Sequence, residues 1–396
     1  MSAAANRQIA EEVEPLSVRV CARLVMDTTD PDITFDENGV CNYWHEFQAF
    51  KATLPTREDR ERQREEIIAE IKAAGQGKEY DCVLGLSGGV DSSYLALLAR
   101  DYGLRPLVVH LDNGWNSELA VNNIEHIVEK MGFDLQTHVL EWDQFRDLQR
   151  AYFKASVIDL EVPTDNLITG CLNRLAAEHG IKYQLSGNNY ATEWLMPPRW
   201  NYTKHDGANM KAIHRRFGEK SIGKLPVADL LNNTYYHFAK GLRSVRLLNL
   251  IDFNKQAAKE RLMAEVGWRD YGGKHYESIY TRFYQGYILP RKFGVDKRKA
   301  HLSNLILSGE ITRDEALREL QQPTYDDDLK QRDKVYVAKK LGFSEDEFET
   351  LLTQENVPHE AFGSDETSRD LYKKVVTNLG KVKRKVTGQA KRRTAY

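Results

Sequence analysis

The stretch CVLGLSGGVDSS, residues 82–93, decides the fold of this chain. Residues 82–86 have the pattern of a short strand buried on both faces and bounded by a turn signal. From Val90 onward, apolar residues recur at helical spacing. We therefore expect Ser87–Gly89 to form a glycine turn between a strand and the first turn of a helix. Such a turn directs several backbone N–H groups, and the positive end of the helix dipole, toward one point that suits an anion.

The details of this loop narrow the class of anion. It is not a Walker A loop, because no Gly-Lys-Ser/Thr follows a four-residue spacer, and the dinucleotide pattern G-x-G-x-x-G is absent. The remaining pattern, Ser-Gly-Gly-x-Asp-Ser, resembles the pyrophosphate loop of the ATP-pyrophosphatase (PP-loop, adenine nucleotide alpha hydrolase-like) superfamily. The resemblance implies cleavage of ATP between its alpha and beta phosphates. The alternative is a tight strand-to-helix turn without a ligand.

Roles follow for the residues of the loop. The glycines let the backbone approach closely, and nearby hydroxyls add donors. The expected pyrophosphate-binding groups are Ser87, Gly88, Gly89, Ser92 and Ser93. Asp91 is the expected carboxylate ligand of a Mg²⁺ ion that bridges the phosphates, with a helix N-cap as its alternative role. Ser87, Asp91 and Ser92 are the expected catalytic residues.

Composition fits a globular cytoplasmic protein. The 396 residues can hold two or three domains, and a net charge of −2 gives no general attraction to nucleic acid or acidic lipid. Four cysteines are too few for a disulfide framework, which favours a reducing compartment. We expect no signal peptide and no membrane span, because no stretch approaches the ~20 apolar residues that a membrane helix needs.

Strand and helix patterns alternate along the chain. Strands are expected at 82–86, 106–111, 136–140 and 182–185, with helices at 57–78, 90–100, 117–131 and 169–179. This order predicts an α/β fold with a doubly wound parallel sheet, whose ligands lie at the carboxyl ends of the strands. The expected domains are an N-terminal ribbon-like module (1–56), a PP-loop ATP-binding domain (57–205), a helical substrate-binding region (206–330) and C-terminal helices with a basic tail (331–396).

Two further loops follow expected strands. Asp112 and Asn113 offer hydrogen bonds to an adenosine, and Trp115 offers a stacking face; the alternative is an Asp-Asn-Gly turn that precedes a helix capped by Ser117. The loop that contains Gly187 and Asn188 resembles the turn that closes over the nucleotide in the superfamily. Its alternative is a helix N-terminus.

Residues 271–320 carry a narrower resemblance, and so do residues 20–44. Both segments are similar to the N-acetyl sugar amidotransferases, PP-loop enzymes of bacterial surface-polysaccharide (LPS O-antigen) biosynthesis. The resemblance implies that an N-acetyl carbonyl of a nucleotide sugar, such as UDP-2,3-diacetamido-2,3-dideoxymannuronate, is adenylated by ATP. Ammonia then replaces the oxygen to give an acetamidino group.

A sugar-nucleotide acid carries a diphosphate and a carboxylate, which fixed cations recognise. On the resemblance, the candidate substrate-binding residues are Lys274, His275, Glu277, Arg291, Lys292, Lys297 and Arg298. The alternative for the basic run is a solvated helix face.

Family members open with two C-x-x-C pairs, the spacing of a zinc ribbon. Here Cys21 and Cys41 stand at the first position of each pair, whereas Leu24 and Trp44 occupy the second positions. Two thiolates do not complete a tetrahedral zinc site. We therefore expect a metal-free remnant held by packing, with Zn²⁺ bound by Cys21 and Cys41 as the alternative.

The ammonia source is expected to be another protein. The resemblance implies a separate glutaminase and a cyclase-like subunit that passes ammonia across, and nucleic acid is not an expected partner. The alternative function is a PP-loop tRNA-modifying enzyme that thiolates or amidates a base, which the basic segment 381–393 and the position of Cys171 at a helix start would favour. A third reading is a nucleotide-binding subunit without catalysis.

Overall fold

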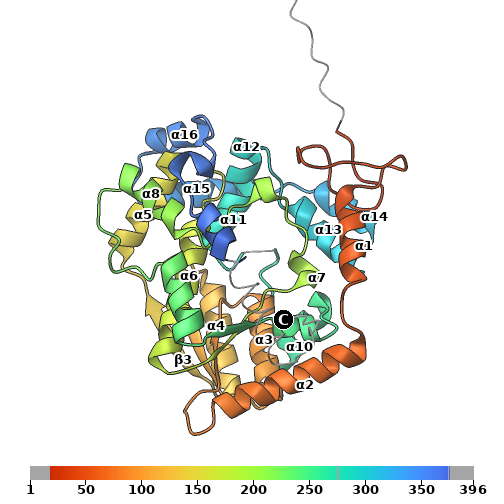
Figure 1. Ribbon diagram of the computed structural model, residues 1–396. Helices are drawn as coiled ribbons and strands as arrows, with labels where there is room; N and C mark the ends of the chain where they lie inside the picture. The colour runs from red at the N-terminus through yellow and green to blue at the C-terminus, as the bar shows by residue number, and fades with distance from the viewer. Residues whose placement is uncertain (1–17, 274–275, 373, 375–396) are drawn as a thin grey trace, which may run out of the picture.

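A parallel five-stranded sheet lies in the lower half of the computed structural model, which describes residues 18–273, 276–372 and 374 (Figure 1). Its order is β3-β2-β1-β4-β5. The strands are β1 (Cys82–Gly85), β2 (Pro106–Asp112), β3 (Asp134–Val139), β4 (Tyr183–Leu185) and β5 (Arg243–Val245). The order reverses between β1 and β4, which is where ligands bind in open sheets of this kind.

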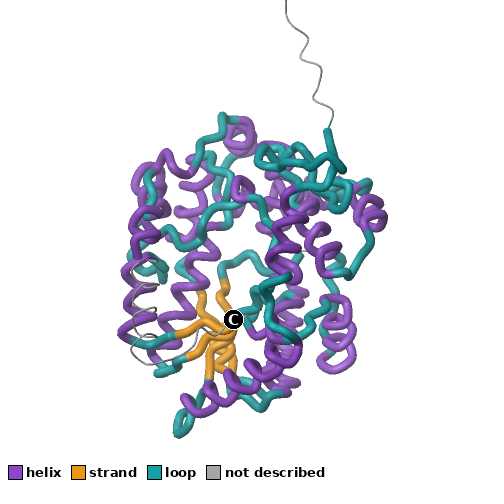
Figure 2. The backbone as a smooth tube through the Cα atoms, turned by 45° about the vertical axis from the view of Figure 1, so that its right-hand side comes forward, coloured by secondary structure: helices purple, strands orange, loops and turns teal. Residues whose placement is uncertain are grey.

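Both faces of the sheet are covered, as Figure 2 shows for the strands and their surrounding helices. Leu84 and Val108 pack on one side with α2 (Arg57–Ala74), α3 (Val90–Asp101), α4 (Glu118–Met131) and α10 (Lys255–Val266). Val83 and Leu107 point to the other side, against α6 (Val162–Glu178). Successive residues of one strand thus enter two different cores, which explains the unbroken apolar run of β1. The predicted doubly wound fold is confirmed.

The helices beyond the sheet share one further hydrophobic core, and the N-terminal segment joins it through Cys21, Leu24 and Cys41. The remaining α-helices are α1 (Asn42–Lys51), α5 (Trp142–Ala155), α7 (Tyr190–Glu193), α8 (Gly207–Phe217), α9 (Leu230–Thr234), α11 (Ile279–Phe283), α12 (Leu289–Phe293), α13 (Arg298–Ser308), α14 (Arg313–Leu320), α15 (Asp327–Leu341) and α16 (Glu345–Thr353). Short 3₁₀ or π turns cover Pro198–Trp200, Tyr235–Ala239, Leu247–Leu250, Tyr284–Ile288 and His359–Phe362. The C-terminal region is therefore helical, as predicted.

Two elements differ from the sequence-based expectation. Strand β5 was not predicted, because its three residues Arg-Ser-Val carry no alternation and pair only with β4 at the sheet edge. Helix α6 begins at Val162 rather than at 169, since Pro163 occupies the first turn, where a missing N–H costs nothing. In the part of the chain that the structure describes, no helix is both long and apolar enough to cross a membrane.

Candidate active site

The loop after β1 has the geometry of an anion-binding turn. Gly88 takes a left-handed backbone conformation, with φ of +82°. The amide of Gly89 donates to Ser87 Oγ at 3.2 Å, and the hydroxyls of Ser87 and Ser92 lie 3.1 Å apart. Gly89 is the N-cap of α3 and has no side chain that could cap the first amides of that helix, which leaves the positive end of the helix dipole at the loop. The turn between strand and helix, predicted from the sequence, is confirmed.

The loop after β4 packs directly on the start of α3. A β-carbon at Gly187 would lie 3.4 Å from the amide nitrogen of Ser92. Beside it, Asn188 donates from Nδ2 to Glu193 at 3.0 Å, and Asn189 caps α7 by accepting from Thr192. The fold therefore brings the loop containing Gly187 and Asn188 against the glycine loop at the switch point of the sheet. The helix N-terminus that we considered for this segment is also present.

The loop after β2 is a self-bonded turn. Asp112 Oδ1 accepts from the amide of Gly114 at 2.8 Å, and Asn113 Oδ1 accepts from Trp115 at 3.1 Å. Ser117 caps α4 by accepting from Ala120. The expectation that Trp115 offers a stacking face to adenosine is wrong, because its side chain is 0% exposed and its Nε1 donates to Gln149.

A distant segment of the chain reaches the glycine loop through this turn. Asn116 and Ser278 form an antiparallel bridge, and the amide of Ser117 donates to the carbonyl of Glu277 at 2.8 Å. As a result, Glu277 Oε1 lies 3.8 Å from the place that a β-carbon on Gly89 would take. Glu277, predicted as a substrate-binding residue, thus lies at the edge of the glycine loop.

The glycine loop has two further neighbours that sequence reasoning missed. The carbonyl of Gly88 accepts from Trp268 Nε1 at 2.8 Å and from the hydroxyl of Tyr271 at 2.6 Å. Both residues come from the segment after α10, some 180 positions away along the chain. No local pattern signals such a pairing.

A cluster of charged side chains lies at the N-terminus of α6. Lys204 pairs with Asp159 at 2.7 Å and with Asp165 at 3.2 Å, while Lys297 lies 3.5 Å from Glu161. The Asp165 side chain is 42% exposed, so a ligand can reach it.

Helix geometry places this cluster relative to the glycine loop. A β-carbon added to Gly85, the last residue of β1, would contact the side chain of Leu172 in α6. Helix α6 begins ten residues before Leu172 and runs antiparallel to the strands, so it extends about 15 Å past that point at 1.5 Å per residue. The first turn of α6 therefore lies beyond the carboxyl ends of the strands. The glycine loop begins at this same edge of the sheet.

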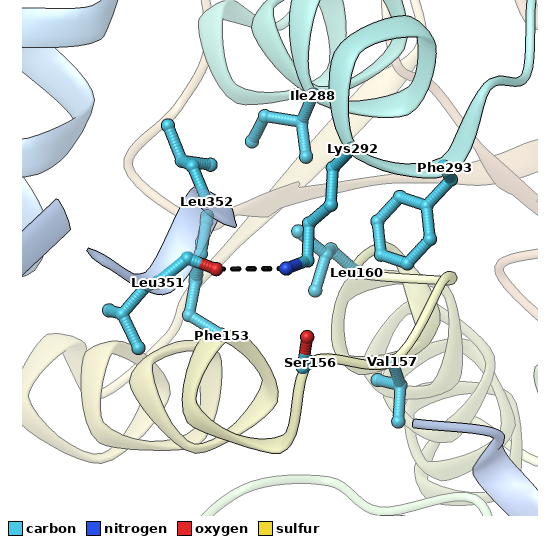
Figure 3. Close-up of a pocket in the computed structure, with 9 residues that line it drawn as sticks. All are labelled: Phe153, Ser156, Val157, Leu160, Ile288, Lys292, Phe293, Leu351 and Leu352. Carbon is cyan, nitrogen blue, oxygen red and sulfur yellow. Dashed lines mark hydrogen bonds between the residues drawn. The ribbon is translucent and has the colours of Figure 1, made fainter. Parts of the chain in front are cut away.

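The other basic candidates are held by protein partners. Arg291 pairs with Glu349 at 3.1 Å, and Arg298 pairs with Asp296 at 2.8 Å. Lys292 reaches into a small apolar pocket, where it donates to the carbonyl of Leu351 at 3.0 Å (Figure 3). It also donates to the carbonyl of Gln354 at 2.7 Å. Lys274 and His275 lie outside the described residues. The substrate roles of these side chains stay predictions.

Two predicted metal positions have few protein ligands. Within residues 18–273, 276–372 and 374, no three His, Cys, Asp or Glu side chains gather as a metal cluster would require. Asp91 lies in the first turn of α3, so a Mg²⁺ there would take its other ligands from phosphates and water, as Mg²⁺ commonly does. Its residue type and position fit that ion.

At the N-terminal position, Cys21 Sγ accepts the amides of Cys41 at 3.2 Å and Leu24 at 3.4 Å. A hydrogen bond from the Cys41 thiol, with these amides, lowers the pKa of Cys21 to about 5. The contact and burial raise the pKa of Cys41. The two cysteines are thus adjacent, and the ribbon-like module remains a prediction.

The chain was compared with known proteins. Residues 277–376 match the family described as LPS biosynthesis protein WbpG-like, C-terminal domain. The match begins at Glu277, the residue that meets the glycine loop. The family resemblance read from the sequence is thereby confirmed in the C-terminal region. No significant match was found among proteins of curated function.

Two of the solved structures that match this chain are distantly similar to it. One is a predicted subunit of a tRNA methyltransferase from Methanocaldococcus jannaschii, with 14% identity, a TM-score of 0.28, and coverage of 46% of this chain and 75% of that one. Another is NMN synthetase from Francisella tularensis, with 12% identity, a TM-score of 0.29, and coverage of 57% of this chain and 97% of that one. TM-scores this low do not establish a shared fold.

Proposed function

We propose that this chain is an ATP-dependent amidotransferase of LPS biosynthesis that converts an acetamido group of a nucleotide sugar into an acetamidino group. One observation carries the proposal. The glycine loop between β1 and α3 meets Glu277, where the match to the WbpG-like C-terminal domain begins. This proximity supports a single site in which the turn binds the phosphates of ATP and the region related to LPS biosynthesis proteins binds the acceptor.

The glycine loop would hold the pyrophosphate part of ATP. The first amides of α3 and the dipole of this 12-residue helix favour an anion at the turn. The hydroxyls of Ser87 and Ser92, which lie 3.1 Å apart, add two donors on one side of the loop. Ser93 is fully buried, so its predicted contact with phosphate requires the ligand to enter deeply. Asp112 and Asn113, with Gly187 and Asn188, would frame the rest of the nucleotide.

The acceptor would lie beyond the loop, along α6. Glu277 lies near the glycine loop, and Asp165 and Lys204 lie near the first turn of α6. Lys297 is buried against Glu161, which places one of the predicted substrate cations at the same end of the helix. Hydroxyl, carboxylate and diphosphate groups of a sugar nucleotide need such a mixture of acidic and basic partners.

The reaction proceeds in two displacements. The acetamido oxygen attacks the alpha phosphorus of ATP, the bond to pyrophosphate breaks, and the amide nitrogen gives up its proton, which leaves an O-adenylyl imidate. Ammonia then attacks the imidate carbon and AMP leaves with the oxygen, which yields the amidine. In the first step the loop amides and hydroxyls stabilise charge that develops on pyrophosphate, so the protein acts by positioning and electrostatics.

A Mg²⁺ ion bound with ATP would neutralise charge on the phosphate oxygens. Asp91 would hold it, directly or through water. The other residues of the loop orient the triphosphate so that the alpha phosphorus faces the acceptor.

We also propose that ammonia comes from a separate glutaminase through a cyclase-like subunit, and that the enzyme acts in the cytoplasm. A glutaminase needs an accessible thiolate. All four cysteines are buried, and burial raises the pKa of Cys171 to about 11 and that of Cys82 still higher. Cys21 has a low pKa but is enclosed beside Cys41.

The test supplies purified protein with ATP, Mg²⁺, ammonium and a UDP-diacetamido-uronate. We expect AMP and pyrophosphate in equal amounts, together with a sugar in which one oxygen is replaced by NH. Turnover only with tRNA would instead indicate the base-modifying alternative. ATP binding without AMP formation under every condition would indicate a non-catalytic subunit.

A further inference from the structure

The peptide unit between Gly88 and Gly89 is fixed from both sides. Its carbonyl oxygen accepts from Trp268 Nε1 at 2.8 Å and from the hydroxyl of Tyr271 at 2.6 Å. Its amide donates to Ser87 Oγ at 3.2 Å. Trp268 is buried, and burial raises the pKa of Tyr271, so the phenol keeps the proton that it donates.

The direction of this carbonyl determines the direction of an amide in the loop. In a planar trans peptide, the C=O and the following N–H point in opposite directions. Holding the Gly88 carbonyl toward Trp268 and Tyr271 therefore turns the Gly89 N–H to the opposite side. Gly88 has φ of +82°, a value that glycine adopts without strain, and Gly89 follows it in an extended conformation with φ of −65° and ψ of 162°.

The alternative orientation would prevent phosphate binding. Glycine has access to both signs of φ, so this peptide can rotate unless something holds it. After such a flip the carbonyl oxygen would face the anion and repel it. The carbonyl of Gly88 therefore needs a hydrogen-bond donor from outside the loop to hold its orientation.

The segment that carries Trp268 and Tyr271 is itself hydrogen-bonded to helix α4. Asn123 of α4 donates from Nδ2 to the carbonyl of Arg269 at 2.9 Å, and its Oδ1 accepts from the amide of Arg269 at 2.9 Å. Asn123 is buried, so these bonds are shielded from water. The backbone between Trp268 and Tyr271 is therefore held in place independently of the glycine loop.

We propose that Trp268 and Tyr271 are positioning residues, which hold the Gly88–Gly89 peptide in the orientation that binds the pyrophosphate part of ATP. This inference rests on the proposed function, and it assigns to the segment after α10 a task within the same site. Neither side chain is required to touch the substrate.

The test compares binding of inorganic pyrophosphate and of AMP by calorimetry, using the full chain. Tyr271→Phe removes one donor and keeps the ring. We expect its pyrophosphate dissociation constant to rise about tenfold, the effect of one lost hydrogen bond, while AMP binds as in wild type. Trp268→Phe should act in the same direction. Tyr284→Phe is the matched control, since Tyr284 donates to the carbonyl of Ile158 at the same distance of 2.6 Å.

A selective loss of pyrophosphate affinity in Tyr271→Phe, absent in Tyr284→Phe, supports the inference. Unchanged pyrophosphate affinity in Tyr271→Phe, or a parallel loss of AMP affinity, overturns it while leaving the proposed function intact. If wild-type protein binds neither pyrophosphate nor ATP, the proposed function fails and the inference fails with it. Should Trp268→Phe not fold, Tyr271→Phe alone decides.

Discussion

Gly187 and Asp91, which follow two different strands, lie so close at the switch point of the sheet that a methyl group at position 187 would touch Asp91. A β-carbon at position 187 would lie 3.7 Å from Asp91 Cβ and 3.5 Å from the carbonyl carbon of Asp91. This contact leaves room for one methyl group and for little more. The loop after β4 therefore lies directly beside the first turn of α3.

A size series at Gly187 tests this contact. Gly187→Ala should retain turnover within about twofold, because its β-carbon meets only ordinary contact distances. Gly187→Leu should displace the first turn of α3 and lower kcat/KM for ATP by at least about tenfold, since overpacking typically costs about 1–3 kcal/mol. Equal activity of the two variants would contradict the contact. The measurement is steady-state AMP release.

Gly88→Ala should lower both ATP turnover and stability. The residue has φ of +82°, and its new β-carbon would lie 2.9 Å from the carbonyl oxygen of Ala120 and from the hydroxyl of Tyr271. We expect a loss of about 1–3 kcal/mol in the free energy of unfolding from strain alone. Gly132→Ala is the control, since its φ is +65° and no atom lies within 4 Å. AMP release should remain normal in that control, and a similar activity in both variants would argue against a special role for Gly88.

Asp91→Asn should lower kcat for AMP formation by about a hundredfold, the scale on which single electrostatic contributions act. The amide keeps the shape of the side chain and removes its charge. Thermal unfolding should be unchanged within a few degrees. Raising the Mg²⁺ concentration should restore part of the rate if Asp91 holds the ion, and a variant with wild-type kcat would exclude that role.

Lys297 and Lys292 should behave differently when replaced by methionine. Lys297 lies with Glu161 at the N-terminus of α6, so Lys297→Met should raise KM for the sugar nucleotide. Lys292 donates to two carbonyls of the α16 region, so Lys292→Met should lower stability by about 2–3 kcal/mol and leave KM unchanged. If Lys292→Met instead raised KM while Lys297→Met lowered only stability, the acceptor site would lie near α16. Substrate titrations and chemical denaturation measure the two effects.

Acid should destabilise the protein through His359. This buried imidazole accepts the amide of Asp159 on Nε2 at 3.3 Å, and burial lowers its pKa to about 4. The unfolded chain binds a proton at a pH near 6.5 and the folded one does not, so stability falls as pH drops from about 6.5 toward about 4. The full loss is about 3 kcal/mol. His359→Gln should show a weaker pH dependence of unfolding in this window, and an unchanged dependence would contradict the assignment.

The sheet and the site were predictable to different degrees. β1, the glycine loop and α3 could be read locally, because buried strands and amphipathic helices have characteristic periods. β5 could not, since a strand of only three residues at the sheet edge carries no recognisable period. The contacts of Gly88 with Trp268 and Tyr271 also escaped prediction, because they join residues 180 positions apart. Trp115 shows that residue type and position in the sequence do not reveal whether a side chain faces a ligand, because this aromatic residue beside a candidate site is buried in the core.

The most direct test follows the acetamido oxygen itself. A UDP-diacetamido-uronate labelled with a heavy isotope of oxygen in its acetamido carbonyl is turned over with ATP and ammonium, and the AMP is analysed by mass spectrometry. The account predicts that the heavy oxygen appears in the phosphate of AMP. Unlabelled AMP, or formation of ADP in its place, would contradict adenylation of the acceptor.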